Sequence, residues 1–285
     1  MSTVAILGAG LMGAAMASRL AEEGHDVRVW DRTGARATAL EGKNITPCPD
    51  PAAAVGGADL ALTMVTDAAA VRAVAAQMLA ALGPHGLWLQ TSTVGAAAAD
   101  EFAALATSHG VTMIDAPVSG STGPARAGTL TWLISGPPAA IARARPVLDS
   151  LGSRCIVAGE GQQASRLKLV VNGWMCAATT AMADALEQCG RLSFDPASFL
   201  AAIEDGPLSM PYASAKGELM RAERFAPGFP VHLALKDMRL LGEAVGDTGR
   251  TLHALVTERL ARAEGAGHGD DDVAAVAAVP ADPEA

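Results

Sequence analysis

The stretch TVAILGAGLMG, residues 3–13, decides the fold of this chain. It begins with a short apolar run that predicts a β-strand over Thr3–Leu7, and a helix is expected to begin four residues later. Three glycines at the GxGxxG spacing join the two. The first permits a tight turn, the second lets the backbone approach a pyrophosphate, and the third lets the helix pack on the strand. This context predicts a dinucleotide site at the helix N-terminus. The expected cofactor contacts in this turn are Gly8, Gly10, Leu11, Met12 and Gly13.

An acidic residue at the end of the second predicted strand bears on which dinucleotide fits. Asp31 lies 18 residues beyond Gly13, where a carboxylate accepts bonds from ribose hydroxyls and disfavours a 2′-phosphate, so it favours NAD. Arg32 and Thr33 follow it, and a guanidinium beside a hydroxyl suits a 2′-phosphate, which favours NADP. A solvated loop cation explains Arg32 equally well. The sequence leaves NAD and NADP close to even.

Apolar runs alternate with Ala-rich helical segments as far as about Ala158, which is typical of a parallel sheet with crossover helices. Strands are expected at Thr3–Leu7, Asp26–Asp31, Leu60–Met64, Gly86–Gln90, Thr112–Asp115, Thr129–Ser135 and Ser153–Val157. The sequence therefore predicts an α/β, Rossmann-type parallel-sheet N-terminal domain over residues 1–160, which binds the dinucleotide.

The rest of the chain predicts helices alone. Residues 162–188 contain no Pro and would extend about 40 Å as one connecting helix, which we place over about 162–190. Further helices are expected at Asp195–Glu204, Pro211–Ala222, Val231–Ala244, Thr251–Ala263 and Asp271–Ala278. Residues 161–285 are thus expected to form an all-α C-terminal domain for substrate binding and oligomerisation.

Polar residues follow two strands at the carboxyl edge of the predicted sheet, where open sheets bind ligands. Val65 and Thr66 follow one strand, and Thr93 follows the next. We expect them beside the nicotinamide and its ribose. Helix capping is the alternative role for residues of this kind.

A Gly/Ser-rich loop, DAPVSGSTGPARAGTL, begins at Asp115. Ser119, Gly120 and Ser121 present backbone donors and hydroxyls there with few side chains in the way, which predicts a cradle for a substrate carboxylate. A stretch of this composition is by itself more often a turn than a site. Only the other motifs of the chain favour the cradle.

Lys168 and Asn172 are the candidate catalytic pair. They lie four residues apart in the predicted connecting helix, so that an ammonium and a carboxamide share one helix face. A cation that gives or takes a proton beside a nicotinamide is what reversible oxidation of an alcohol to a carbonyl requires. A lone helical lysine is usually a surface cation, and the asparagine one turn later counts against that interpretation.

Composition excludes several classes of partner. The formal net charge is −9 at pH 7, with Lys and Arg scattered singly, which argues against nucleic acid or an anionic membrane as partner. The first strand follows Met1 too closely for a signal peptide, and we expect no membrane-spanning run of about 18 apolar residues. The cysteines form no CxxC pair, and the histidines form no HExxH motif or other zinc pattern. We therefore expect a cytoplasmic enzyme with no bound metal and a small molecule as its partner.

The chain resembles the β-hydroxyacid dehydrogenase family, which includes 3-hydroxyisobutyrate dehydrogenases and tartronate semialdehyde reductases. Four motifs carry the resemblance: GAGLMGAAMASRL from Gly8, DAPVSGSTGPARAGTL from Asp115, KLVVNGW from Lys168 and FPVHLALKDMRL from Phe229. GHGDDDVAAV from Gly267 resembles the closing segment of the family. The motifs stand in the family's order over nearly the whole chain.

The resemblance implies a role for each matching residue. Ser119, Gly120 and Ser121 would bind the substrate carboxylate, Lys168 would be the general acid and base, Asn172 would orient the substrate, and Lys236 would reach the cofactor. It also implies a cleft between two domains, a homodimer or homotetramer, and interconversion of a small β-hydroxyacid with its semialdehyde or keto form by NAD or NADP. Ser121 stands where the family commonly has a second glycine, which leaves the substrate acid undetermined.

Two alternative functions stay open from the sequence alone. Imine reductases share the architecture but usually carry another residue at the position of Lys168, so the lysine favours hydroxyacid chemistry. A dinucleotide-binding sensor without activity is the non-enzymatic alternative. Sugar-phosphate decarboxylation is disfavoured, because the 6-phosphogluconate dehydrogenases have a histidine where this chain has Val171.

Overall fold

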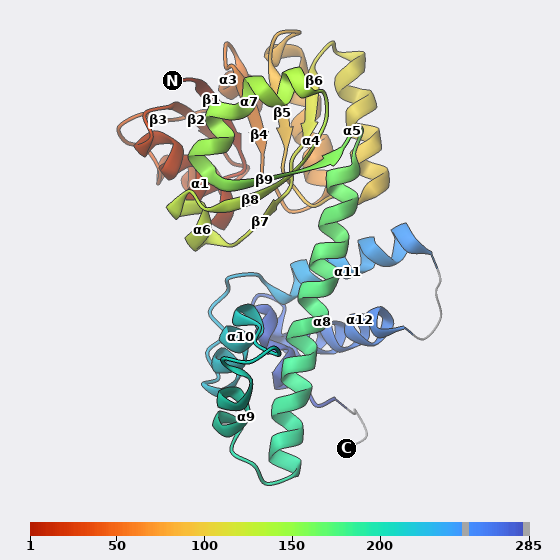
Figure 1. Ribbon diagram of the computed structural model, residues 1–285. Coiled ribbons are helices and arrows are strands. Elements are labelled where there is room, and N and C mark those ends of the chain that lie inside the picture. Colours follow the sequence, from red (N-terminus) through yellow and green to blue (C-terminus); the bar gives the residue numbers. More distant parts are fainter. Residues whose placement is uncertain (247–250, 282–285) are drawn as a thin grey trace. The chain divides into compact units, whose positions relative to one another are not determined.

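The computed structural model describes residues 1–246 and 251–281, and the chain divides into two units (Figure 1). The first unit is Met1–Lys168, and the second begins at Leu169. Both predicted fold classes are confirmed, an α/β parallel sheet followed by helices. The division by contacts falls within one long helix, whereas the sequence places the domain boundary between residues 160 and 161, before that helix begins.

The first unit, residues 1–168, is built on a nine-stranded sheet in the order β3-β2-β1-β4-β5-β6-β8-β7, with β9 paired to β8. The six strands from β3 to β6 are parallel. Strand β8 is antiparallel to β6 and β7, and β9 is parallel to β8. The strands are β1 (Thr3–Leu7), β2 (Asp26–Trp30), β3 (Ile45–Pro47), β4 (Leu60–Thr63), β5 (Leu87–Gln90), β6 (Thr112–Asp115), β7 (Val118–Ser119), β8 (Leu130–Ser135) and β9 (Gly152–Gly159).

All seven predicted strands are present, with ends within two residues of the prediction. Two further strands, β3 and β7, were missed. Strand β3 has three residues and ends in Pro47, and β7 has two residues inside the Gly/Ser-rich loop. Neither is long enough to show the alternation that identifies a strand from sequence.

Helices cover both faces of this sheet, because successive side chains of a strand point to opposite faces. Val4 and Ile6 pack into a core with α1 and α7, whereas Ala5 and Leu7 pack into a second core with α3, α4 and α5. All four side chains are fully buried. The helices of this unit are α1 (Leu11–Glu22), α2 (Gly34–Thr38), α3 (Pro51–Val55), α4 (Ala68–Leu82), α5 (Ala96–Ser108), α6 (Thr122–Ala127) and α7 (Pro138–Leu151).

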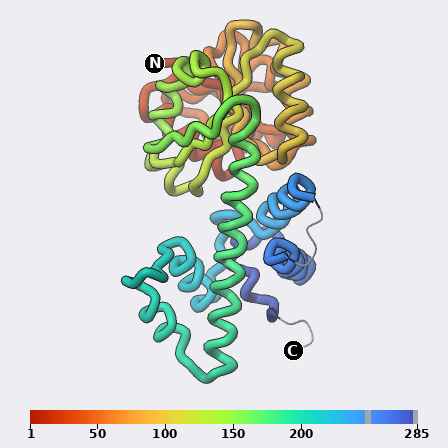
Figure 2. Tube along the Cα trace, turned by 45° about the vertical axis from the view of Figure 1, so that its right-hand side comes forward, coloured from red at the N-terminus to blue at the C-terminus, as the bar shows by residue number. Residues whose placement is uncertain are grey.

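The second unit consists of helices gathered along α8 (Gln163–Arg191), which has 29 residues. In Figures 1 and 2, α9 (Pro196–Ile203) and α10 (Pro211–Arg221) lie on one side of α8, and α12 (Leu252–Ala263) lies on the other. Helix α11 (Val231–Val245) packs against α12. A π-helical turn, η1 (Glu264–His268), and a 3-10 helix, η2 (Val273–Ala278), follow.

The final helix corrects a prediction, since an α-helix was expected over Asp271–Ala278 and η2 is a 3-10 helix. Asp272 is the N-cap residue of this helix. Asp272 accepts the backbone N–H of Ala274, and its carboxylate also accepts the N–H groups of Gly228 and Phe229. Asp272 is 1% exposed and pairs with Lys216 at 2.5 Å, so one buried carboxylate joins three segments of the helical unit.

Helix α8 is long and apolar enough, by length and composition alone, to cross a membrane, which differs from the sequence-based expectation. Core helices of soluble proteins pass the same test. Cys176, Met182 and Ala183 of α8 lie in the hydrophobic core of the helical unit, with Met175 and Leu186 packed against it. Part of the apolar surface of this helix is therefore used in packing within the unit, whereas Val170 and Trp174 are exposed, at 59% and 67%.

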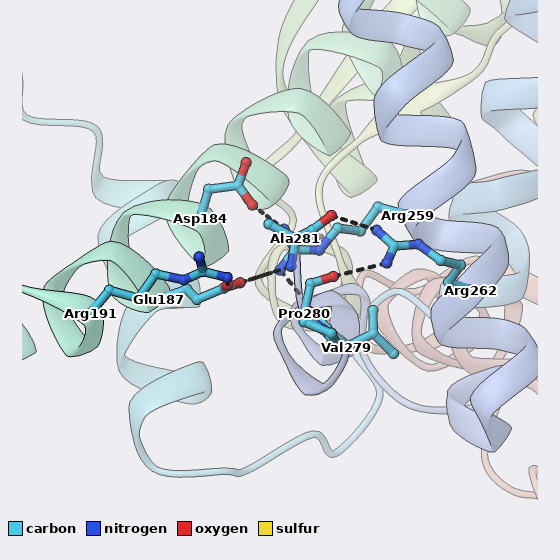
Figure 3. A network of polar contacts seen from close by, with 8 residues as sticks. All are labelled: Asp184, Glu187, Arg191, Arg259, Arg262, Val279, Pro280 and Ala281. Carbon is cyan, nitrogen blue, oxygen red and sulfur yellow. Dashed lines mark hydrogen bonds and ion pairs between the residues drawn. The ribbon is translucent and has the colours of Figure 1, made fainter. Parts of the chain in front are cut away.

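A buried guanidinium fastens the end of the described chain to α8 (Figure 3). Arg259, 4% exposed, pairs with Asp184, lies 3.5 Å from Glu187, and donates to the carbonyl oxygen of Val279 at 2.9 Å. Arg262 donates to the carbonyls of Pro280 and Ala281, each at 3.0 Å. The backbone N–H of Ala281 returns a bond of 2.8 Å to Glu187.

The electrostatic effect of this cluster is visible at Glu187. Burial alone would raise the pKa of Glu187, but the Ala281 N–H and the Arg191 guanidinium outweigh it and lower that pKa below its ordinary value. The ionised carboxylate is therefore favoured in the fold.

Replacing Arg259 tests the importance of this cluster for stability. We expect Arg259→Met to lower the free energy of unfolding by about 2–3 kcal/mol, because it leaves Asp184 and the Val279 carbonyl without their cation, whereas Glu187 keeps Arg191. This loss of stability is smaller than that expected for a fully buried ion pair, because 40% of the Asp184 side chain is exposed. Chemical denaturation followed by circular dichroism measures it.

Arg221→Met in the same unit is the matched control, because Arg221 and Glu218 are about half exposed and form an ordinary surface pair. Its loss should cost less than about 1 kcal/mol. Equal effects of the two substitutions would contradict a special role of Arg259.

Candidate functional site

The glycine turn between β1 and α1 lies at the point where the sheet order reverses, between β1 and β4. Gly8 has φ +113°, and a Cβ there would collide with the carbonyl oxygen of Met64 at the end of β4. A Cβ on Gly13 would collide with the carbonyl of Gly8. At Gly10, by contrast, a Cβ meets no atom within 4 Å. The first and third glycines are thus required by the fold itself, and the second opens a space next to the turn.

Leu11 and Met12, which follow this turn, form the first residues of α1. Leu11 is 56% exposed although it is a large apolar residue, and Met12 is partly buried against the core. Gly10 precedes the helix as its N-cap residue, and no side chain caps α1 there. The first N–H groups of a helix have no partner within it, and in α1 they directly follow the open position at Gly10.

Asp31 joins the glycine turn to the loop after β2. Its Oδ2 accepts the N–H of Ala9 at 2.8 Å, and its Oδ1 accepts the N–H of Thr33 at 2.8 Å. The residue is 9% exposed, and the guanidinium of Arg36 lies 3.9 Å from Oδ1. Both oxygens thus hold backbone in place. Arg32 lies exposed on the same loop.

The residues after β4 and β5 lie at the same edge, since these strands run parallel to β1. The N–H of Val65 donates to the hydroxyl of Ser92 at 2.9 Å. Thr66 is exposed, and Thr93 is half-buried. The structure therefore places Gly10, Asp31, Val65, Thr66 and Thr93 at the carboxyl ends of four adjacent strands, as the sequence predicted for a ligand edge.

The predicted carboxylate cradle follows β6. Ser119 ends β7, Gly120 has φ +131°, and Ser121 precedes α6. A Cβ on Gly120 would lie 2.8 Å from the side chain of Leu130, so the position requires glycine both for its backbone angle and for space. Ser119 is half-buried, whereas Gly120 and Ser121 are exposed. The backbone of this turn is thus accessible to a ligand.

A buried carboxylate connects the sheet to the beginning of α8. Asp115, the last residue of β6, is 1% exposed. Its Oδ2 accepts the N–H of Ser165 at 2.7 Å, and its Oδ1 accepts the Ser165 hydroxyl at 2.6 Å. The hydroxyl of Ser135 donates to Oδ2 at 3.3 Å and accepts the N–H of Ala164 at 3.0 Å. Two N–H groups of the first turn of α8 thus find acceptors on the sheet.

The charge of Asp115 is costly in this position. Burial raises the pKa of Asp115 above its ordinary value, although the hydrogen bonds from Ser165 and Ser135 and the charge of Arg166 act in the opposite direction. Desolvation therefore outweighs the favourable contacts of the carboxylate.

Lys168 lies on α8, three residues after Ser165, and is the last residue of the first unit. Asn172 follows it by four residues on the same continuous helix, so the two side chains share one face. In the second unit Asn172, 3% exposed, donates from Nδ2 to Asp237 Oδ2 at 2.5 Å. The ammonium of Lys236 lies 2.8 Å from Asp237 Oδ1. Asn172 and Lys236 are thus brought together by one buried carboxylate.

The sequence interpretation missed the polar groups that support the site. Asp115 stands in a quoted motif but had no assigned role, and nothing in the sequence pairs it with Ser165 or Ser135. Ser92 is 1% exposed and accepts the N–H of Val65, but it resembles any hydroxyl at a strand end. An acidic residue at the end of a predicted apolar strand is a sequence signal that could have pointed to Asp115.

No group of three or more His, Cys, Asp or Glu side chains suited to a metal ion occurs among residues 1–246 and 251–281.

Comparison with known proteins covers nearly the whole chain. Residues 3–159 match the family described as the NAD binding domain of 6-phosphogluconate dehydrogenase. Residues 159–279 match the family described as NAD-binding of NADP-dependent 3-hydroxyisobutyrate dehydrogenase.

Individual relatives agree with these matches. A probable 3-hydroxyisobutyrate dehydrogenase of Mycobacterium tuberculosis is 33% identical, with 88% of each chain covered. Glyoxylate/succinic semialdehyde reductase 1 of Arabidopsis thaliana is 29% identical, with 96% of each chain covered. The solved structure of the 3-hydroxyisobutyrate dehydrogenase of Mycobacterium tuberculosis with L-serine has a TM-score of 0.88 at 31% identity, covering 98% of each chain.

Gly10→Ala tests whether the open space at the glycine turn receives a ligand. The fold should tolerate the new methyl group, since nothing lies within 4 Å of it, and the melting temperature should change little. Dinucleotide affinity should fall about tenfold or more, equivalent to roughly 1.4 kcal/mol. Fluorescence titration with NADH and NADPH measures the affinity.

Gly190→Ala is the control, because that glycine is also open but lies within α8. It should leave dinucleotide affinity unchanged. An unchanged affinity in Gly10→Ala as well would contradict binding at the turn.

Asp115→Asn tests the cost of the buried charge. A raised pKa means that the folded state holds a proton that the unfolded state releases, so wild-type stability falls as pH rises from 3.8 through the raised value. The neutral amide has no such dependence. The free energy of unfolding of Asp115→Asn relative to wild type should therefore rise with pH across that window, measured by denaturation at several pH values. A constant difference would contradict the assignment.

Proposed function

The chain belongs to the β-hydroxyacid dehydrogenase family that includes the 3-hydroxyisobutyrate dehydrogenases, as its motifs predicted, and we propose that it interconverts a small β-hydroxyacid and its semialdehyde or keto form. The cofactor is a nicotinamide dinucleotide, NAD or NADP, which accepts or donates the hydride when bound. The proposal makes the protein an oxidoreductase that acts on a CH–OH group.

The strand ends of the first unit supply the proposed cofactor contacts. The turn of Gly8, Gly10 and Gly13 leaves room for a pyrophosphate beside the free N–H groups of α1, which supports its binding there. Asp31 holds the backbone of both neighbouring loops, which supports a ribose site between them. The full set that we propose for the cofactor is Gly8, Gly10, Leu11, Met12, Gly13, Asp31, Arg32, Thr33, Val65, Thr66, Thr93 and Lys236.

Lys168 is proposed as the general acid and base. In the oxidative direction its amine takes the hydroxyl proton as hydride leaves the carbinol carbon, and in the reductive direction its ammonium stabilises and protonates the developing alkoxide. The observation that carries this proposal lies within the first unit. Asp115 ends the strand that leads into the Ser119 loop, and it also binds the turn of α8 that precedes Lys168.

Substrate binding is assigned to groups on either side of that lysine in the sequence. Ser119, Gly120 and Ser121 are proposed to bind the carboxylate, because their turn is accessible and glycine is required at its centre. Asn172 is proposed to orient the substrate, with Asp237 holding its amide nitrogen.

The remaining features of the proposal concern the whole molecule. We propose residues 1–160 as the dinucleotide-binding domain and residues 161–285 as the substrate and oligomerisation domain. We also propose that the protein is a homodimer or homotetramer in the cytoplasm and has no nucleic acid or membrane partner. The net charge of −9 supports the absence of an anionic polymer as partner.

Lys168→Ala is the decisive substitution. Turnover with a panel of aldehydes (succinic, methylmalonic and tartronate semialdehydes and glyoxylate), each with NADH and NADPH, should fall by roughly 100-fold or more. Dinucleotide affinity should not change, because the lost group acts on the carbonyl oxygen. Steady-state kinetics and fluorescence titration provide the two measurements.

Lys43→Ala, at an exposed lysine of the first unit, controls for the loss of one positive charge and should retain full activity. Unchanged turnover in Lys168→Ala would remove Lys168 from the mechanism. Dinucleotide binding by the wild-type protein without turnover of any panel member would contradict the dehydrogenase assignment.

A further inference from the structure

We propose that Asp115 is a positioning residue of the reaction. It acts through Ser165 to hold Lys168 at a fixed position relative to the carboxylate cradle of Ser119, Gly120 and Ser121. The inference rests on the proposed role of Lys168 as general acid and base. It concerns groups within the first unit alone, residues 1–168.

Both oxygens of Asp115 are engaged by Ser165, one by the backbone N–H at 2.7 Å and the other by the hydroxyl at 2.6 Å. Two bonds from one residue to one carboxylate restrain both the position and the rotation of the helical turn that carries them. A single cap bond would restrain only the position.

Groups of the sheet cap the beginning of α8. The first N–H groups of a helix have no partner within it, and an anion near them is favoured by the helix dipole. Here the N–H of Ser165 is taken by Asp115 of β6, and the N–H of Ala164 by the hydroxyl of Ser135 of β8. Asp115 and Ser135 are themselves the paired residues where β6 and β8 meet. The beginning of α8 is thereby attached to two strands.

The attached residues lie only a few positions before the cradle and before Lys168 in the chain. Asp115 precedes Ser119, the first residue of the cradle, by four residues, and Ser165 precedes Lys168 by three. The segment between Asp115 and the cradle is held by the sheet, since Ala116 donates its N–H to the carbonyl of Gln90 and is fully buried. The buried carboxylate of Asp115 is therefore the shared attachment point of the cradle loop and of the helical turn.

Burial makes the charge of Asp115 unfavourable for the fold. Desolvation of Asp115 outweighs its favourable contacts, so a neutral group of the same shape would serve the stability of the unit at least as well. Groups that are costly to the fold are expected where positioning for function requires them. The pair Arg166–Asp100 also attaches this turn, but Arg166 is 40% and Asp100 50% exposed, and such pairs restrain little.

A double-mutant cycle tests the proposal. Asp115→Ala should lower kcat for aldehyde reduction about tenfold, while KM for the aldehyde and the dissociation constants of NADH and NADPH stay within about twofold. Asp115→Asn, which keeps the shape and one acceptor but neither the charge nor the second acceptor, should restore kcat only in part. In a Lys168→Ala background, Asp115→Ala should have no further effect, because the residue acts through the lysine. Asp100→Asn is the matched control, because Asp100 of α5 pairs with Arg166 on the same turn of α8, and it should leave kcat unchanged.

Ser165→Ala provides the same comparison should Asp115→Ala fail to fold. It removes only the hydroxyl bond, so kcat should fall about threefold, and again only when Lys168 is present. The proposal is overturned if kcat is unchanged in the folded variants, or if it falls equally in the Lys168→Ala background. These outcomes are distinct from a failure of the proposed function, in which Lys168→Ala alone would retain turnover.

Discussion

The close approach of backbone to backbone at the switch point of the sheet is the constraint on which the nucleotide-binding half depends. Gly8 and Gly13 touch each other, and Gly8 also touches the end of β4, so that no side chain fits at either position. This contact sets the distance between β1, β4 and the start of α1. The uncapped start of that helix follows the open position at Gly10, where we propose that a pyrophosphate binds.

Three buried carboxylates of this protein stabilise the fold by accepting hydrogen bonds from backbone N–H groups. Asp31 binds the loops after β1 and β2, Asp115 binds the start of α8, and Asp272 binds the loop before α11 and the start of η2. Each is less than 10% exposed. A carboxylate accepts several N–H bonds at once, and these bonds are stronger than those between neutral groups. Segments distant in the sequence are thereby held at defined positions.

Several elements were predictable from the sequence because their signals are local. Strand β1 and the glycine turn follow from an apolar run and the spacing of three glycines, and α8 follows from a long stretch without Pro. The sequence also allowed us to predict that one edge of the sheet carries Gly10, Asp31, Val65 and Thr93, because parallel strands place their carboxyl ends together. Strands β3 and β7 could not be predicted, because two or three residues are too few to show a recognisable periodicity. The 3-10 form of η2 could not be predicted either, because the few hydrogen bonds that define it leave no periodicity in the sequence.

By itself, the sequence determined the order of sheet and helices, the turn that can receive a dinucleotide, and the shared helix face of Lys168 and Asn172, because each depends on spacing along the chain. The tertiary structure alone decided which groups support them. Asp115 and Ser165 lie 50 residues apart, and Asn172 and Asp237 lie 65 apart. No pattern in the sequence joins such pairs, since their contact arises only when the strands have been ordered and the helices packed.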